Sequence, residues 1–134
     1  MGADLCIDPI GQNVKEVLAE NGIERISTVI ECVGKVATMA QAIDIAGQKS
    51  TVMLFGLTAP GDVLPIKPFE LFKKEIVLKA SYINPYTQKR ALALIEGGKV
   101  DVSSIVYGCE PLEKLPEILA DASLRAKGKI IITP

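Results

Sequence analysis

The chain has 134 residues, 49% of them hydrophobic, and its 15 basic and 16 acidic residues leave a formal net charge of -1. This length favours one domain with a real core, and the near-neutral charge disfavours nucleic-acid binding, which needs a basic surface. The sequence has no histidine, which excludes Ser-His-Asp and Cys-His catalysis and H-E-x-x-H zinc sites built from this chain alone.

The cysteines and the apolar stretches bear on where the protein resides. Cys6, Cys32 and Cys109 are spaced unlike any metal or redox motif, and such a sparse, odd set predicts a reducing cytoplasm. The longest uncharged stretch, residues 50–61, is interrupted by Gly and Pro and is too short to span a bilayer. The opening residues have no basic flank before an apolar region, so we expect neither a secretory signal nor membrane contact.

The first half of the chain alternates predicted strands and helices. Residues 3–8 alternate polar and apolar side chains and predict a short edge strand, and a helix over 13–21 ends at Asn21-Gly22. Two buried strands, 26–34 and 50–56, each end in glycine and flank a helix over 36–47. This order is typical of a parallel α/β sheet, whose ligands bind at the carboxyl ends of the strands.

The second half continues the pattern and then changes character. Residues 57–68 contain three prolines and predict an irregular loop. We expect a short helix at 69–75, a strand at 76–83, and a helix that starts at Asn84-Pro85 and ends near Glu96. Shorter elements follow, with a strand at 105–107, a helix at 111–126 and a closing strand at 128–133.

An ordered series of short motifs spans nearly the whole chain. The series is Ala-Asp-x-x-Ile-Asp-Pro, Val-Ile-Glu-Cys-Val-Gly, Phe-Gly-Leu, Phe-x-Lys-Lys-Glu-Ile, Ser-Tyr-Ile-Asn-Pro, Gly-Gly-Lys-Val-Asp, Pro-Leu-Glu-Lys and Gly-Lys-Ile-Ile-Ile. It resembles the C-terminal portion of the zinc-dependent medium-chain alcohol dehydrogenases, nearest to the polyol (sorbitol-like) and threonine dehydrogenase branch.

The resemblance implies an α/β fold, a partial Rossmann-like three-layer structure with a mainly parallel sheet. Residues 1–100 would be the C-terminal part of the NAD(P)-binding domain, and residues 101–134 a segment returning toward the catalytic domain, in one compact unit. The parent enzyme would use NAD(P) and zinc to oxidise a small alcohol or polyol. This chain lacks the zinc ligands, the first two strands and the Gly-rich turn, so it would hold no catalytic or metal residue and would be inactive alone.

The resemblance also assigns cofactor contacts. It places Cys32, Val33 and Gly34 near the adenosine ribose, Phe55, Gly56 and Leu57 beside the nicotinamide amide, Ser81, Tyr82 and Ile83 on the nicotinamide side of the cleft, and Lys129 near the pyrophosphate. Several of these assignments have an alternative. Gly34 and the 55–57 segment also suit simple strand ends, Cys32 suits a small core residue better than a reactive thiol, Tyr82 suits an interface, and Lys129 suits a solvated surface.

Two further expectations concern a buried charge and an open strand. Glu31 stands in an apolar run, and we expect backbone or arginine partners at the strand end. The exposed edge at 26–33 must be covered, either by the opening segment or by a second chain. We therefore expect a homo-oligomer formed through that edge. The resemblance implies strand 76–83 as the other interface, because the family commonly dimerises through the matching strand. The alternatives are a zinc-free quinone-reductase-like relative and a truncated, non-catalytic domain that only self-associates.

Overall fold

The computed structural model describes residues 2–83 and 85–134. The chain divides into two compact units, Asp4–Ile83 and, separately, Asn84–Pro134 with Met1–Ala3. We expected one compact unit with a change of character after residue 100, whereas the observed division follows residue 83. Each unit has its own sheet.

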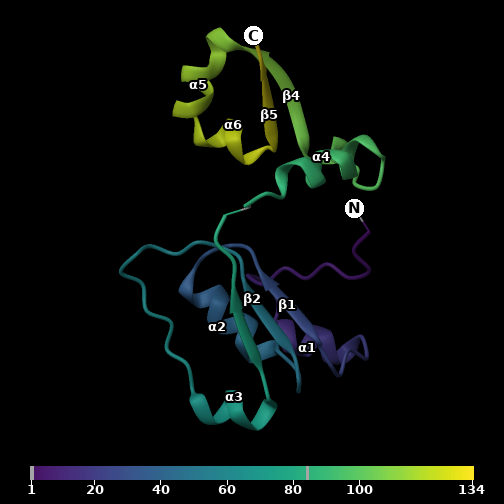
Figure 1. Cartoon of the computed structure of the whole chain (residues 1–134), viewed down its shortest axis with the longest axis vertical. Helices are drawn as coiled ribbons and strands as arrows, with labels where there is room; N and C mark the ends of the chain where they lie inside the picture. Colours follow the sequence, from purple (N-terminus) through teal and green to yellow (C-terminus); the bar gives the residue numbers. More distant parts are fainter. Residues whose placement is uncertain (1, 84) are drawn as a thin grey trace. The chain divides into compact units, whose positions relative to one another are not determined.

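The first unit is built on a three-stranded parallel sheet in the order β1-β2-β3 (Figure 1). The strands are β1 (Thr28–Glu31), β2 (Thr51–Leu54) and β3 (Val77–Ala80). Each lies within a stretch predicted to be a strand, and the central strand β2 pairs with both neighbours. The predicted α/β fold class with parallel strands is therefore confirmed.

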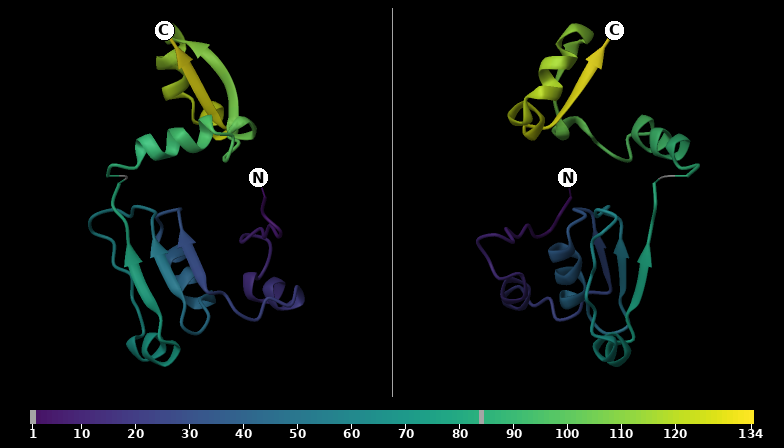
Figure 2. Two further views of the ribbon diagram at one scale, coloured as in Figure 1. Left: turned by 45° about the vertical axis from the view of Figure 1, so that its right-hand side comes forward. Right: turned by 90° about the vertical axis from the view of Figure 1, so that its left-hand side faces the viewer.

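Helix α2 (Val36–Ile45) covers one face of this sheet and forms the core with it (Figures 1 and 2). Ala42, Ala46 and Val52 are the buried centre of this contact. Small alanine side chains let the helix backbone approach the sheet closely, and the β-branched Val52 on the central strand fills the space beneath them.

The other helices of the first unit begin and end where the sequence predicts. Helix α1 (Val14–Glu20) starts after Asn13, whose side-chain oxygen accepts the Lys15 N–H at 3.1 Å. It stops at Gly22, which has the positive φ of 69° that such a stop requires. Helix α3 (Pro68–Lys74) opens with a proline and lies at the end of the sheet where the strands begin (Figure 2).

The prediction of a strand at residues 3–8 is wrong. These residues have no regular secondary structure, and a turn follows them, in which the Asp8 carboxylate accepts the Ile10 N–H at 3.0 Å and the Asp8 carbonyl accepts the Gln12 N–H at 3.0 Å. Consequently, within the described residues, β1 pairs with β2 alone and its other edge is open. The opening segment was one of the two predicted covers for that edge, and it does not pair with β1. The other predicted cover, a second chain, stays a prediction.

The second unit contains a two-stranded parallel sheet of β4 (Val106–Pro111) and β5 (Lys129–Thr133). Around it the chain forms α4 (Gln88–Glu96), α5 (Leu115–Ala120), α6 (Ala122–Ala126) and the 3₁₀ turns Ser103–Ile105 and Leu112–Lys114. The continuous helix predicted over 111–126 is broken at Asp121, which has extended backbone angles and caps α6 by accepting the Ser123 N–H at 2.8 Å.

The helix predicted to start at Asn84-Pro85 starts later, at Gln88, and the proposed capping role of Asn84 falls outside the described residues. Across the part of the chain that is described, no helix combines the length and the hydropathy needed to cross a bilayer.

Candidate functional site

The loops that follow the three parallel strands meet at one edge of the first sheet. Residues 32–34 follow β1, residues 55–57 follow β2 and residues 81–83 follow β3. Because the strands are parallel and in register, their carboxyl ends share this edge. The fold thus brings together every predicted cofactor residue except Lys129, and we call residues 32–34, 55–57 and 81–83 the carboxyl edge.

At the base of the carboxyl edge lies the buried carboxylate of Glu31, which is only 5% exposed. It accepts the Val33 N–H at 2.8 Å, the Gly34 N–H at 2.9 Å and the Thr38 hydroxyl at 2.7 Å. Of the two kinds of partner predicted, backbone or arginine, the backbone N–H groups are present, and the Thr38 hydroxyl joins them. A carboxylate with this many donors can be buried without a counter-charge.

The surroundings of Glu31 shift its ionisation. Burial acts to raise the pKa of the carboxyl group, but hydrogen bonds from the Thr38 hydroxyl and from the Gly34, Val33 and Gly56 N–H groups outweigh it. The net result is a pKa below the ordinary glutamate value. Glu31 therefore carries its charge throughout the neutral range, and its interactions are those of an anion.

The first two loops of the carboxyl edge are held together by backbone contacts. The Glu31 carbonyl accepts the Phe55 N–H at 2.9 Å and the Gly56 N–H at 2.8 Å. A Cβ atom added at Gly34 would collide with the carbonyl oxygen of Leu57 and lie 2.7 Å from its nitrogen. A Cβ added at Gly56 would collide with the Gly34 nitrogen and lie 2.6 Å from a Glu31 carboxylate oxygen.

These contacts explain both glycines without a ligand. Gly34 also has φ +80°, a conformation that residues with a Cβ rarely adopt. Of the two interpretations of Gly34, the structure supports the tight turn, because the chain itself occupies the space where a side chain would extend. A close approach of a cofactor to this backbone stays a prediction.

The other side chains of the carboxyl edge are exposed and largely apolar. Val33, Leu57, Tyr82 and Ile83 are each more than 60% exposed, and Phe55 is about half exposed. Cys32 is exposed as well, so the expectation that it is a core residue is wrong. It follows the last residue of β1 and lies in the loop, outside the α2 contact that buries small side chains. Together these residues form an apolar rim around the internally hydrogen-bonded loops.

Lys129 lies on β5 in the second unit and is exposed. Beside it in sequence, the Lys127 ammonium donates to the Tyr107 hydroxyl at 3.3 Å and stands 5.2 Å from the centre of the Tyr107 ring. A contact of Lys129 with a pyrophosphate stays a prediction.

The described residues do not provide a zinc site. Across residues 2–83 and 85–134, no three His, Cys, Asp or Glu side chains gather closely enough to hold a metal ion. The composition agrees, because the sequence contains no histidine.

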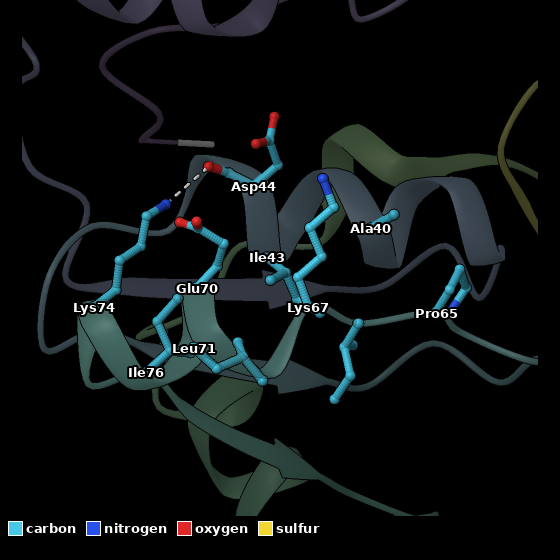
Figure 3. Close-up of a pocket in the computed structure, with 10 residues that line it drawn as sticks. Ala40, Ile43, Asp44, Pro65, Lys67, Glu70, Leu71, Lys74 and Ile76 are labelled. Carbon is cyan, nitrogen blue, oxygen red and sulfur yellow. Dashed lines mark hydrogen bonds between the residues drawn. The ribbon is translucent and has the colours of Figure 1, made fainter.

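A hollow of about 340 Å³, which we call the α3 hollow, lies at the opposite end of the sheet from the carboxyl edge, between α2, α3 and the start of β3 (Figure 3). Figure 3 shows Lys74 reaching from α3 to the end of α2, where its ammonium donates to the carbonyls of Asp44 at 3.4 Å and Ala46 at 3.1 Å. Lys74 therefore caps the C-terminus of α2, where a positive charge is favourable. None of the predicted cofactor residues lines this hollow.

Sequence reasoning missed Thr38 and Lys74. A signal for Thr38 was present in the sequence. Its hydroxyl lies in the first turn of the helix that directly follows the strand containing Glu31, so it was a candidate hydrogen-bond donor to that carboxylate. Lys74 gave no such signal, because a lysine at the end of a short helix is usually solvated.

Comparison with known proteins places this geometry in context. The family model described as zinc-binding dehydrogenase matches residues 1–97. D-arabinitol dehydrogenase 1 of Uromyces fabae is 23% identical over 117 residues, which are 87% of this chain and 34% of that protein. The chain thus spans about a third of the length of this curated relative.

Solved structures match over nearly the whole chain. One, described as a zinc-binding dehydrogenase of Sinorhizobium meliloti 1021 bound to NADP, superposes with a TM-score of 0.90 at 26% identity, over 99% of this chain and 40% of its own. Another, described as a short chain alcohol dehydrogenase of E. coli CFT073 complexed with NADH, has a TM-score of 0.85 at 16% identity, over 99% of this chain and 39% of its own, and shows a shared fold.

Proposed function

The chain belongs to the zinc-binding dehydrogenase family, and we propose that its carboxyl edge forms one wall of the cofactor cleft in an NAD(P)-linked alcohol or polyol dehydrogenase. The observation that carries the proposal is the convergence of the 32–34, 55–57 and 81–83 loops at one edge of a parallel sheet. It is supported by the zinc-binding dehydrogenase of similar structure that was solved bound to NADP. A polyol substrate is suggested by the arabinitol dehydrogenase relative.

The residues of the carboxyl edge suit the uncharged parts of a dinucleotide. The exposed side chains of Val33, Phe55 and Leu57 offer apolar surface to flat rings. The Val33 and Gly34 N–H groups already donate to Glu31, so they do not form the cluster of free amides that binds a phosphate. We therefore assign this edge to the ribose and carboxamide portions of NAD(P). For Lys129, which belongs to the other unit, a pyrophosphate contact is supported by the family resemblance alone.

NAD(P), when bound, accepts the hydride that leaves the alcohol carbon. The part of this chain described by the structure does not fit the zinc ion of the family, so no step of the reaction is assigned to its residues. Its role is to bind and orient the cofactor. In the longer enzyme, residues 1–100 would serve the NAD(P)-binding domain and residues 101–134 would return toward the catalytic domain.

Oxidation assays of the purified 134-residue chain test the catalytic part of this proposal. With NAD or NADP and a panel of alcohols and polyols that includes arabinitol, we expect no reduced cofactor to form. Turnover that survives treatment with a chelator and scales with the chain concentration would contradict the assignment.

Titration with NADH, followed by amide NMR, tests the binding part. We expect weak binding, in the millimolar range, because no Gly-rich turn holds the pyrophosphate. Shifts should concentrate at residues 32–34, 55–57 and 81–83. Shifts that instead cluster at the α3 hollow, around Ala40, Leu71 and Ile76, would place the nucleotide elsewhere and refute the proposal.

Self-association is supported by a separate observation. Every residue of the edge strand β3 is exposed, and β1 has an open edge within the described residues. Open strand edges favour pairing with another chain. We propose a homo-oligomer formed through one of them. Sedimentation of the wild type should give a mass above that of one chain, and a monomeric wild type would refute the proposal. Leu78→Lys should lower this mass if the chains pair through β3, and Ile30→Lys should lower it if they pair through β1.

A cytoplasmic location also stays a proposal. It is supported by Cys6, Cys32 and Cys109, which are all free and exposed. Exposed free thiols persist where the surroundings are reducing.

A further inference from the structure

The Glu31 side chain contacts both loops at the base of the carboxyl edge. Its carboxylate accepts donors from the loop after β1 and from the first turn of α2. It also lies against Gly56 in the loop after β2, where a carboxylate oxygen would be 2.6 Å from an added Cβ. The Glu31 backbone carbonyl separately holds the Phe55 and Gly56 N–H groups. One residue, through side chain and backbone, therefore sets the relative position of two loops.

The 32–34 loop and the 55–57 loop are in direct backbone contact, so a displacement of one requires a displacement of the other. Gly34 and Leu57 are already so close that no Cβ fits between them, and Gly56 stands equally close to Gly34. If the carboxylate released the 32–34 loop, that loop could not move toward Leu57 and would have to move away from it. The exposed side chains on both loops, Val33 and Phe55 among them, would lose their spacing.

We infer that Glu31 is a positioning residue for the nucleotide site: it fixes the two loops that face the cofactor without touching the cofactor itself. The inference rests on the proposed function for the identity of the ligand, and on the hydrogen bonds above for the coupling. Glu31 is 5% exposed and its lone pairs are committed to the chain's own donors. A direct contact with a ligand is therefore not its role.

Few other ionisable groups can disturb a titration of this carboxylate. The segments that pack around it contribute Cys32 from the β1 loop and Lys35 at the start of α2, both exposed, while residues 55–57 contribute none. A common pH-dependent change in the surrounding amides therefore reports Glu31.

The test compares the wild type, Glu31→Gln and the control Glu70→Gln, which makes the same chemical change on an exposed residue of α3. In the wild type, the amide resonances of Val33, Gly34 and Gly56 should titrate together, with one midpoint below the ordinary glutamate value. The shared titration should vanish in Glu31→Gln and persist in Glu70→Gln. Hydrogen exchange at Gly34 should accelerate on the order of tenfold in Glu31→Gln, with Val52 unchanged.

A second variant keeps the inference testable if Glu31→Gln fails to fold. Thr38→Val removes one donor and leaves the carboxylate on the amides, so the three amides should still titrate together with a higher midpoint. Independent midpoints for the two loops, or a shared titration that survives in Glu31→Gln, would overturn the inference.

Adding NADH separates this inference from the proposed function. Smaller NADH-induced shifts at residues 55–57 in Glu31→Gln than in the wild type, with no difference in Glu70→Gln, would support both. If NADH shifts no amide of the carboxyl edge in the wild type while the shared titration is present, the proposed function fails and the coupling by Glu31 stands. If NADH shifts these amides equally in all three proteins, the positioning role fails and the proposed function stands.

Discussion

Replacing Gly34 by alanine tests whether the chain itself, and not a ligand, requires this glycine. The new methyl group would meet two obstacles: the backbone has φ +80°, and the backbone of Leu57 occupies the space. Two other glycines separate these effects. Gly22 has φ +69° with open space around it, whereas Gly61 has open space and no positive φ.

The expected magnitudes follow from these surroundings. A residue with a Cβ in the left-handed region costs about 1–2 kcal/mol, which is the whole effect expected for Gly22→Ala. In Gly34→Ala the loop must also move away from Leu57, which weakens the Glu31 hydrogen bonds to the Val33 and Gly34 N–H groups at about 1 kcal/mol each. We therefore expect Gly34→Ala to lose about 2–4 kcal/mol and Gly61→Ala to change stability by at most about 0.5 kcal/mol.

Urea unfolding followed by circular dichroism measures these differences on the three variants and the wild type. Amide spectra provide a local check, since Gly34→Ala should shift Leu57 and Gly56 more than distant residues. If Gly34→Ala loses no more stability than Gly22→Ala, the loop contact does not constrain this position and the explanation given for Gly34 is wrong.

Three other changes test separate parts of the structure. Ser50→Ala should leave the unfolding free energy unchanged or raise it by up to about 1 kcal/mol, because the buried hydroxyl has no hydrogen-bond partner among the described residues; a loss above 1 kcal/mol in thermal melts would contradict this. Lys74→Met should cost about 1 kcal/mol by removing the cap of α2, with the exposed Lys73→Met as the neutral control in urea unfolding. Because the folded-state pKa of Glu31 is lowered, its contribution to stability is present above the unfolded pKa of about 4.3 and is lost as pH falls through the folded pKa. Urea midpoints measured between pH 3 and 6 should therefore fall on acidification, and they should fall less in Glu31→Gln. An equal dependence of the urea midpoint on pH in the two proteins would refute this.

The parallel sheet could be predicted because its strands carry strong local signals. β1 and β2 lie in short apolar runs, residues 26–34 and 50–56, that end in glycine, and the helix between them has apolar residues at helical spacing. The parallel arrangement then brings their carboxyl ends together at one edge without further information. Even the unusual Glu31 was interpretable, since burial of a charge demands partners at the strand end.

The failed predictions come from local patterns whose outcome depends on other parts of the chain. The alternation of residues 3–8 predicts a strand, but a strand needs a partner, and among the described residues no strand pairs with this segment. The helical spacing over 111–126 is real, yet Asp121 uses its side chain to start a new helix and interrupts the old one. Single-sequence periodicity registers neither a missing strand partner nor a capping side chain.

The two glycines of the carboxyl edge illustrate how a correct position can have a different cause. From the sequence, Gly34 and Gly56 mark strand ends near which a cofactor binds. In the structure each makes room for the other loop, and a buried carboxylate beneath them consumes the amides that a phosphate would need. The wall offered to a ligand is then made by the exposed side chains between and beyond the glycines. If the proposed function holds, the exposed side chains of Val33 and Leu57 should therefore influence cofactor affinity more directly than the glycines do.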